Sequence, residues 1–400
     1  MARKGRRGLL LIAAAGERSF MTRFRSAFVV LMVCAAAGAL SACGSSTSSS
    51  SGGSANSSSS SSGKGLKVGF IYVSPIPGSA WSLAWDRARQ DLVNKYGAQT
   101  TVVQPIPETS QVVGTMQDLI RKGDKMIFAT AIGYQPFVVQ VAKQNPSVYF
   151  VVTGPWIQTT PRPKNVASVY GNLWEVRYLT GIVAASMSKK KALGFVSAHS
   201  LSSVISGVNG FELGAQSVDP SIKTKVVLTN NWYDPPVSTQ AAETLATSGD
   251  DVIAKHMDDI GACLGAKASG VWCIGSEADT SAQTPSTYLT GSVYNWNKYS
   301  EQKYQQVVGG NFTNNEFDGD LADGLIKLGP VNKIVPASAK SKVTAAEDQL
   351  KSGKLIVYKG PLYSNTGKLM LPAGKTWATP AAVYTHMTFY VKGIVGTVQK

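Results

Sequence analysis

From residue 67 onward, short apolar runs alternate with longer amphipathic segments. The run KVGFIYV at residues 67–73 is almost continuously apolar, which is typical of a strand buried on both faces of a parallel sheet. A loop rich in Ser, Pro and Gly follows, and a helical pattern begins at Ala80. A buried strand followed by a helix is the unit from which parallel sheets are built.

The same unit recurs along the chain in two sets. In the first set the pattern predicts further strands at 100–104, 126–130, 148–152 and 166–170, and helices at 109–122, 134–144 and 176–187. In the second set it predicts strands at 192–196, 225–229, 251–255 and 271–275, and helices at 203–218, 238–248 and 260–268. Two consecutive sets predict an α/β protein with two doubly wound, parallel-sheet lobes.

The basic run Lys189–Lys191 separates the two sets. We therefore place a first lobe at 66–188 and a second at 189–295, and interpret the basic run as a solvated turn. Residues 296–400 are too long for a simple tail, and are expected to return across a multi-strand hinge and complete both lobes. Their pattern predicts helices at 297–307 and 338–352 and a strand at 355–358. Because ligands bind at the carboxyl ends of parallel strands, the cleft between two such lobes is the predicted site.

The N-terminal residues 1–42 have the pattern of a signal peptide. Arg23 and Arg25 precede an apolar run at 27–40, and small residues follow it. This run is too short to cross a bilayer. Its end, LSAC, resembles a lipobox, so Cys43 is predicted to carry lipid and to become the mature N-terminus. An ordinary signal peptide with an incidental cysteine is the alternative. Initiation at Met21 is a hypothesis, and Met1 stays open as the alternative start.

Residues 43–65 are almost entirely Ser and Gly. Such a composition cannot bury enough apolar surface to fold, and it behaves as a coil with an end-to-end distance of roughly 25 Å. We interpret it as a tether that holds an extracytoplasmic domain near the bilayer.

The formal net charge of +15 could indicate a nucleic-acid partner, but its distribution argues against one. Residues 1–42 contribute +6 of it, so a chain beginning at Cys43 would carry +9. Much of the basicity therefore belongs to targeting sequence, and no nucleic-acid partner is predicted.

Four cysteines can be assigned to different roles. Cys34 leaves with the signal peptide and Cys43 is the lipid site, so Cys263 and Cys273 remain. They are ten residues apart across a helix-to-strand connection, and the predicted compartment is oxidising. We predict a disulfide between them; two buried free thiols are the alternative.

The sequence lacks the motifs of common catalytic sites. It contains no HExxH, CxxC, GxSxG or GxxxxGK[ST], and no GxGxxG after a strand. Its only histidines are His199, His256 and His386, too few to build a metal site or a general-base triad readily. We predict that the chain is not an enzyme and uses no metal or cofactor.

Tryptophans follow several of the predicted strands. They are Trp81, Trp156 and Trp232, and a further tryptophan, Trp174, precedes a predicted helix. A tryptophan ring can stack on a planar ligand, with a gain of about 1–3 kcal/mol for each stacked base. The pattern favours a flat, uncharged ligand, and ordinary core packing is the alternative for each ring.

Polar side chains follow the strands of the second set. Asp234 comes after Trp232, His256 and Asp258 come after the strand at 251–255, and Glu277 and Asp279 come after the next strand. Carboxylates accept hydrogen bonds from ring N–H groups or from ribose hydroxyls. For each aspartate taken alone, capping of a helix is the alternative.

Seven dispersed segments, in order along the chain, together resemble one family, the BMP or PnrA-like solute-binding lipoproteins of ABC transporters. The resemblance covers essentially all of 67–396. It implies a type I periplasmic-binding-protein fold, a purine nucleobase or nucleoside as ligand, and an ABC permease as membrane partner. The segments are GFIYVSPIPGSAWSLAWDRAR, YGNLWEVRYLTGIVAA, LGFVSAHSLSSVISGVNGFELGAQSVDP, NNWYDPP, AKHMDDIGA, GSEADTSAQTP and FYVKGIVG.

The resemblance also implies a set of ligand-binding residues. Trp81 occupies the stacking position after the first strand, where many members have Phe. The other cleft-lining positions implied by the resemblance are Trp174, Trp232, Asp234, His256, Asp258, Gly275 and Asp279. The first loop, SPIPGSAW, lacks the acidic residue that nucleoside-binding members place before their aromatic residue. A bare nucleobase such as adenine is therefore the favoured ligand.

Two other functions stay open from the sequence. The same fold could report a ligand to a membrane receptor instead of delivering it to a permease. A nucleoside hydrolase is the second alternative, which the scarcity of histidine and the lack of a metal motif oppose.

Overall fold

The computed structural model describes residues 65–156, 158 and 161–399. The predicted signal peptide, the choice between Met1 and Met21, the lipid site at Cys43 and almost all of the tether lie outside the described residues. The described residues form one compact unit.

The first sheet has six parallel strands in the order β11-β5-β4-β3-β1-β2. Its central strands are buried except at the first residues of β1 and β4, which explains their nearly continuous apolar runs. Its strands and the helices between them are β1 (Lys67–Ile71), α1 (Ala80–Tyr96), β2 (Gln99–Val103), α2 (Gln111–Arg121), β3 (Met126–Ala129), η1 (Ile132–Tyr134), α3 (Gln135–Gln144), β4 (Tyr149–Thr153), β5 (Val166–Gly171) and, much later in the chain, β11 (Glu316–Gly319).

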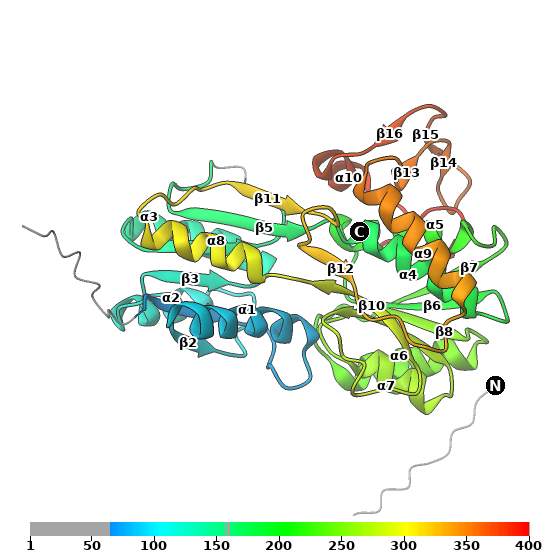
Figure 1. The fold of residues 1–400 in the computed structure, drawn as a ribbon, viewed down its shortest axis with the longest axis horizontal. Coiled ribbons are helices and arrows are strands. Elements are labelled where there is room, and N and C mark those ends of the chain that lie inside the picture. Colours follow the sequence, from blue (N-terminus) through cyan, green and yellow to red (C-terminus); the bar gives the residue numbers. More distant parts are fainter. Residues whose placement is uncertain (1–64, 157, 159–160, 400) are drawn as a thin grey trace, which may run out of the picture. The chain divides into compact units, whose positions relative to one another are not determined.

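The second sheet has seven strands in the order β12-β10-β9-β8-β6-β7-β17, and only β12 runs antiparallel to its neighbour. Figure 1 shows this sheet mainly in green. Its elements are α4 (Leu173–Met187), β6 (Ala192–Ser197), α5 (Ser202–Gln216), β7 (Lys223–Leu228), α6 (Pro235–Thr247), β8 (Val252–His256), α7 (Gly261–Ala268), β9 (Trp272–Glu277), β10 (Tyr288–Tyr294), β12 (Ile326–Leu328) and β17 (Ile394–Val395). The two parallel sheets match the predicted α/β class.

Helix α4 requires a correction to the predicted lobe boundary. We placed it in the first lobe, whereas it packs along α5 beside the second sheet. Glycines allow this close contact: a Cβ at Gly181 would lie 2.0 Å from the carbonyl oxygen of Phe211, and one at Gly214 would lie 1.9 Å from that of Tyr178. The chain therefore leaves the first sheet directly after β5, and not at residue 188. The hydrophobic pattern revealed the helix but not which sheet it covers.

The last hundred residues contribute to both sheets, as their length suggested. Helix α8 (Asn297–Val308) packs beside α1 of the first lobe, β11 extends the first sheet, and β12 and β17 extend the second. The chain therefore passes between the sheets after β5, after β10 and after β11, which gives a hinge of three segments. None of the strands β10, β11 and β12 was predicted.

The C-terminal segment forms a layer over α4 and α5 (Figure 1, orange and red). The predicted strand at 355–358 is wrong for its first three residues, since pairing begins only at Tyr358. Its elements are α9 (Ala337–Lys351), β13 (Tyr358–Lys359), β14 (Leu362–Tyr363), β15 (Leu369–Leu371), β16 (Thr376–Trp377) and α10 (Pro380–His386).

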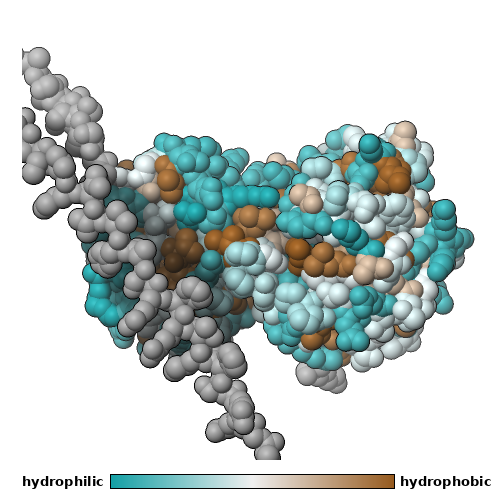
Figure 2. Space-filling view, turned by 90° about the horizontal axis from the view of Figure 1, so that it is seen from below, coloured by the Kyte–Doolittle hydropathy of each residue, from teal (hydrophilic) through white to brown (hydrophobic). Residues whose placement is uncertain are grey.

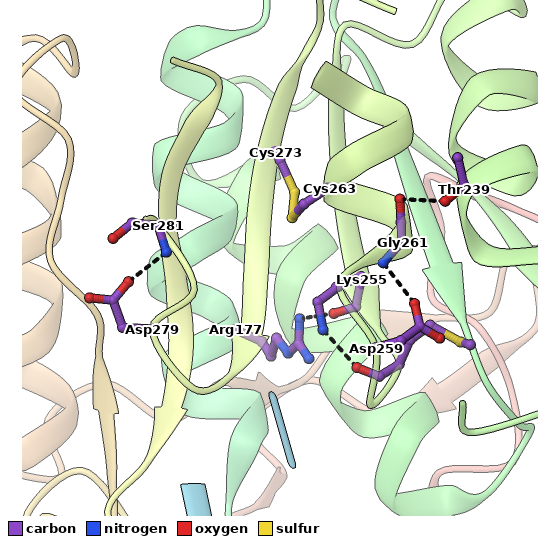
Figure 3. The surroundings of a disulfide bond; sticks show 10 residues. Arg177, Thr239, Lys255, Asp259, Gly261, Cys263, Cys273, Asp279 and Ser281 are labelled. Carbon is purple, nitrogen blue, oxygen red and sulfur yellow. Dashed lines mark hydrogen bonds between the residues drawn. A yellow bond between two sulfur atoms is a disulfide. The ribbon is translucent and has the colours of Figure 1, made fainter. Parts of the chain in front are cut away.

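A disulfide joins Cys263 of α7 to Cys273 of β9, and their Cα atoms are 5.3 Å apart (Figure 3). Both residues are buried. The bond joins α7 to β9, and the last residue of β9, Glu277, lines a pocket.

In the described part of the chain, no helix combines the length and the apolar composition needed to cross a bilayer. On the face seen in Figure 2, apolar residues form separate small patches among hydrophilic ones.

Candidate functional site

A pocket with an empty volume of about 460 Å³ lies where the carboxyl ends of both sheets meet. The lobe that carries β1–β5 contributes Val73, Trp81, Glu108, Ala131, Thr153 and Tyr170, and the other lobe contributes Ser203, Trp232, His256, Asp258 and Glu277.

Trp81 occupies the first turn of α1, directly after the β1 loop. The hydroxyl of Ser79 caps this helix by accepting a hydrogen bond from the Ser82 N–H. The Trp81 indole N–H donates to the carbonyl oxygen of Thr130 at 2.7 Å, and its ring packs edge-on against Tyr294 at 5.3 Å. These contacts fix the orientation of the ring at the pocket wall.

Trp232 supplies an aromatic wall from the other lobe. It lies in the loop between β7 and α6, and its ring contacts His199 edge-on, with 4.7 Å between ring centroids. Its indole N–H donates to the carboxylate of Glu108 at 3.1 Å, and Glu108 also accepts the backbone N–H of Gly133 at 2.7 Å. Glu108 and Gly133 belong to the first lobe, so this bond joins the two lobes.

Asp258 makes two further contacts between the lobes. Its carboxylate accepts a hydrogen bond from the Ser74 hydroxyl at 2.7 Å, and its carbonyl oxygen accepts one from the Ala80 N–H at 2.6 Å. The lobes are thus held together at the pocket edge, which is the arrangement expected of a closed binding protein.

The polar lining of the pocket includes the carboxyl groups of Glu108, Asp258 and Glu277, the imidazole of His256 and three hydroxyl groups. Glu277 is buried, and its Oε2 has no hydrogen-bond partner among the described residues. Burial raises the pKa of Glu277 to about 7. Burial and, next, the charge of Glu277 raise the pKa of Asp258 well above its ordinary value. Burial and then the charge of Arg177 hold the pKa of His256 far below its ordinary value, so its ring is neutral.

Two buried cations lie behind this lining, next to β8 and β9 (Figure 3). The Arg177 guanidinium donates to the carbonyl oxygen of Lys255 at 2.6 Å and to the hydroxyl of Ser276 at 2.7 Å. The Lys255 ammonium donates to the carbonyl oxygen of Met257 at 2.7 Å. No lysine or arginine is among the described residues that line the pocket. The site therefore suits a neutral ligand that carries N–H or O–H donors.

Glu277 should make the stability of the ligand-free protein depend on pH. Its pKa is 4.5 ordinarily and about 7 in the folded protein, so the folded state binds more protons between these values. The contribution of Glu277 to the free energy of unfolding is therefore fully present below about pH 4.5, and it is lost as the pH rises through 7. Relative to Glu277→Gln, wild type should lose up to about 3 kcal/mol of unfolding free energy between pH 4.5 and 8. Denaturant titration of both proteins measures this, and parallel pH curves would contradict it.

Four of the predicted ligand-binding residues, Trp81, Trp232, His256 and Asp258, line the pocket. Two predicted tryptophans do not. Trp156 packs below the guanidinium of Arg162, whose carbon lies 5.1 Å from the ring. Trp174 is buried in α4 against Tyr384, with ring centroids 5.5 Å apart. Their positions near strand ends reflect packing, the alternative that the sequence left open.

The other three predicted residues also have structural roles outside the pocket lining. Asp234 caps α6 by accepting the Val237 N–H at 3.2 Å. Asp279 accepts the Ser281 N–H at 3.0 Å (Figure 3). At Gly275 a Cβ would lie 2.1 Å from the hydroxyl oxygen of Tyr288, so close packing of that ring requires glycine.

Several lining residues were not selected from the sequence. Glu108 follows the strand at 99–103, and the rule applied to the second set, that carboxylates after strands are candidates, would have found it. Glu277 was noticed but not selected. Tyr170 lies inside β5, and Ser203 lies in the first turn of α5. Neither carries a signal that distinguishes it from ordinary strand and helix residues.

A family model described as "ABC transporter substrate-binding protein PnrA-like" (Bmp) matches residues 66–360. The chain belongs to this family. The Bmp chain is 32% identical over 332 residues to a purine-binding protein of Brucella abortus, a match that covers 82% of the chain and 93% of that relative. It is 27% identical over 337 residues to a putative ABC transporter glucose-binding protein of Haloferax volcanii, covering 84% of the chain and 82% of the relative.

Solved structures agree with this fold. An ABC transporter solute-binding protein of Conexibacter woesei superimposes with a TM-score of 0.62 at 22% identity, covering 72% of the Bmp chain and 97% of that structure. The type I periplasmic-binding fold is therefore confirmed. The Bmp chain is an extracytoplasmic substrate-binding protein of an ABC transporter, with a small-molecule ligand and a permease partner. The prediction that it is not an enzyme is confirmed by the family.

Proposed function

We propose that this Bmp-family protein binds a purine nucleobase, preferentially adenine, and delivers it to the permease while anchored by lipid at Cys43. The observation that carries the proposal is the pocket itself, which combines indole rings from both lobes with the buried acceptors Asp258 and Glu277. A planar ring with N–H donors fits both features, because its faces stack on aromatic side chains and its edge donates to carboxylates.

The purine-binding relative from Brucella abortus supports the ligand class. Two features favour a bare base over a nucleoside. The β1–α1 loop has no acidic side chain to bind ribose hydroxyls, and the Ser74 hydroxyl in this loop already donates to Asp258. We propose Trp81, Trp232, His256, Asp258, Glu108 and Glu277 as the ligand-binding residues.

The ligand is tested by identifying what the protein carries. Small molecules released by denaturing the purified protein should include adenine when analysed by mass spectrometry. Calorimetric titrations of the ligand-free protein should then show tight binding of adenine and at least about tenfold weaker binding of adenosine, the loss expected when ribose hydroxyls lack partners. Tight binding of glucose, the ligand in the name of the Haloferax relative, together with no binding of adenine would overturn the proposal.

The anchor and the transport role need separate tests. Mass spectrometry of the N-terminal peptide from the membrane fraction should give a diacylated Cys43, and a Cys43→Ser variant should be released from the membrane.

Loss of adenine uptake in cells that lack this protein would support delivery to a permease. Unchanged uptake, with loss of a transcriptional response to adenine, would instead support the sensory alternative.

A further inference from the structure

The positive charge of the chain is concentrated near its C-terminus. Residues 327–400 contain 11 lysines, no arginine, and only Glu347 and Asp348 as acidic residues, a net charge of +9. Residues 43–326 contain 21 basic and 21 acidic residues, so their net charge is zero. The whole excess charge outside residues 1–42 therefore lies on one continuous segment.

This segment forms an outer layer of the second lobe (Figure 1). Its lysines at 351, 354, 359, 368, 375 and 392 are all exposed. Lys351 pairs with Glu347 at 2.6 Å, and the other five lysines make no ion pair within the described residues. No acidic residue occurs after Asp348. The layer thus presents positive charge that ion pairs within the described residues do not neutralise.

A backbone hydrogen bond brings Lys392 next to Tyr363, an exposed apolar residue of this layer, and another brings Lys375 next to Gly360. Tyr363 pairs with Leu369 across the β14–β15 hairpin, and these two side chains are 42% and 46% exposed. The Lys392 N–H donates to the carbonyl oxygen of Tyr363 at 2.9 Å, and Lys368 adjoins Leu369 in the chain. The Gly360 N–H bonds to the carbonyl oxygen of Lys375 at 2.9 Å. We name this cluster the C-terminal basic surface, which consists of Lys359, Lys368, Lys375, Lys392, Tyr363 and Leu369.

We propose that the C-terminal basic surface docks on an anionic lipid bilayer. Lysines beside an exposed tyrosine and leucine are the combination that binds at a membrane interface, where ammonium groups meet lipid phosphates and apolar side chains enter the headgroup region. The exclusive use of lysine fits a diffuse, fluid field of phosphates, because recognition of one fixed anion favours the bidentate arginine. The proposal does not depend on the identity of the ligand. Docking would hold the second lobe at the membrane and leave the first lobe free to move.

The test measures binding of the full chain to vesicles of phosphatidylcholine, with and without about 30% phosphatidylglycerol, by sedimentation at low salt. The variant Lys359→Glu/Lys368→Glu/Lys375→Glu should partition onto the anionic vesicles at least about tenfold less than wild type, since each lysine near such a surface contributes about 1 kcal/mol. About 0.5 M salt should weaken wild-type binding for the same reason.

A control variant removes equal charge from the first lobe. Lys125, Lys143 and Lys164 are exposed there. Lys125→Glu/Lys143→Glu/Lys164→Glu should change partition less than threefold or so, because these lysines belong to the first lobe and not to the docked surface, and salt screens exposed charges that lie beyond about 8 Å. The N-terminal segment is the same in wild type and both variants, so its contribution to vesicle binding cancels in the comparison. Thermal melts check that each of the three proteins is folded. Equal losses of vesicle binding in both variants would overturn the proposal. It would also be overturned if the C-terminal charge reversal impaired uptake through the permease but left vesicle binding unchanged.

Discussion

Replacing Trp81 by alanine should weaken adenine binding by roughly tenfold or more, measured by calorimetry, because it removes the ring that we propose to stack on the base. Trp81 lines the pocket but is only 9% exposed, with its indole N–H bonded to Thr130. The same change should therefore also lower the free energy of unfolding by about 3–5 kcal/mol, the usual cost of truncating a buried tryptophan. Denaturant titration measures this second effect.

Trp85 provides a matched control on the same helix. It is fully buried and stacks on Trp296, with ring centroids 4.3 Å apart, but it does not line the pocket. Trp85→Ala should destabilise the protein to a similar extent while adenine affinity stays within a few-fold of wild type. Trp81→Leu keeps apolar volume without a flat ring, and should still lose affinity. Wild-type affinity in both Trp81 variants would remove Trp81 from the ligand-binding residues.

Replacing Arg177 by methionine should destabilise the folded protein by about 3–5 kcal/mol, because it removes one of the two cations from a buried charge cluster and leaves Lys255 as the remaining cation beside the carboxylates. Arg177 is completely buried, and its guanidinium holds Ser276 and the carbonyl oxygen of Lys255. The charge of Arg177 also opposes the rise that burial causes in the pKa of Glu277. In the variant, the pKa of Glu277 should therefore rise further.

Denaturant unfolding of Arg177→Met at neutral pH measures the loss of unfolding free energy relative to wild type. Arg121→Met is the control. Arg121 is exposed and forms its ion pair with Asp118 one turn away on the surface of α2. Such a pair contributes at most about 1 kcal/mol, so this variant should remain close to wild type. Equal stabilities of the two variants would show that the buried cation does not compensate the pocket carboxylates.

The regular alternation of strands and helices was predictable from the sequence because a strand buried on both faces needs an apolar residue at nearly every position. Strands β1 to β9 lie within two or three residues of their predicted positions for this reason. Strands of the hinge and the edges were missed. β10 contains Thr290, Gly291 and Ser292 in its centre, and these residues interrupt the apolar run. β11 and β12 are only four and three residues long.

The residues of the candidate site were also only partly predictable from the sequence. Trp81, Trp232, His256 and Asp258 could be selected because each follows a buried strand, and the carboxyl ends of parallel strands meet at one edge of a sheet. The same rule also selected Asp234 and Asp279, which cap or close turns. An aspartate after a strand has the same local sequence whether its oxygens bind a ligand or the backbone of the next helix. Only the direction of the side chain separates these roles.

By itself, the sequence determined the α/β class, the two sets of strands and the strand ends where a ligand would bind, since these depend on local patterns of burial. The tertiary structure decided that α4 belongs with α5, that Glu108 reaches Trp232 across the pocket, and that the buried Oε2 of Glu277 finds no hydrogen-bond partner in the described part of the chain. Each of these depends on contacts between residues far apart in the chain, and no local pattern of polar and apolar positions encodes such contacts.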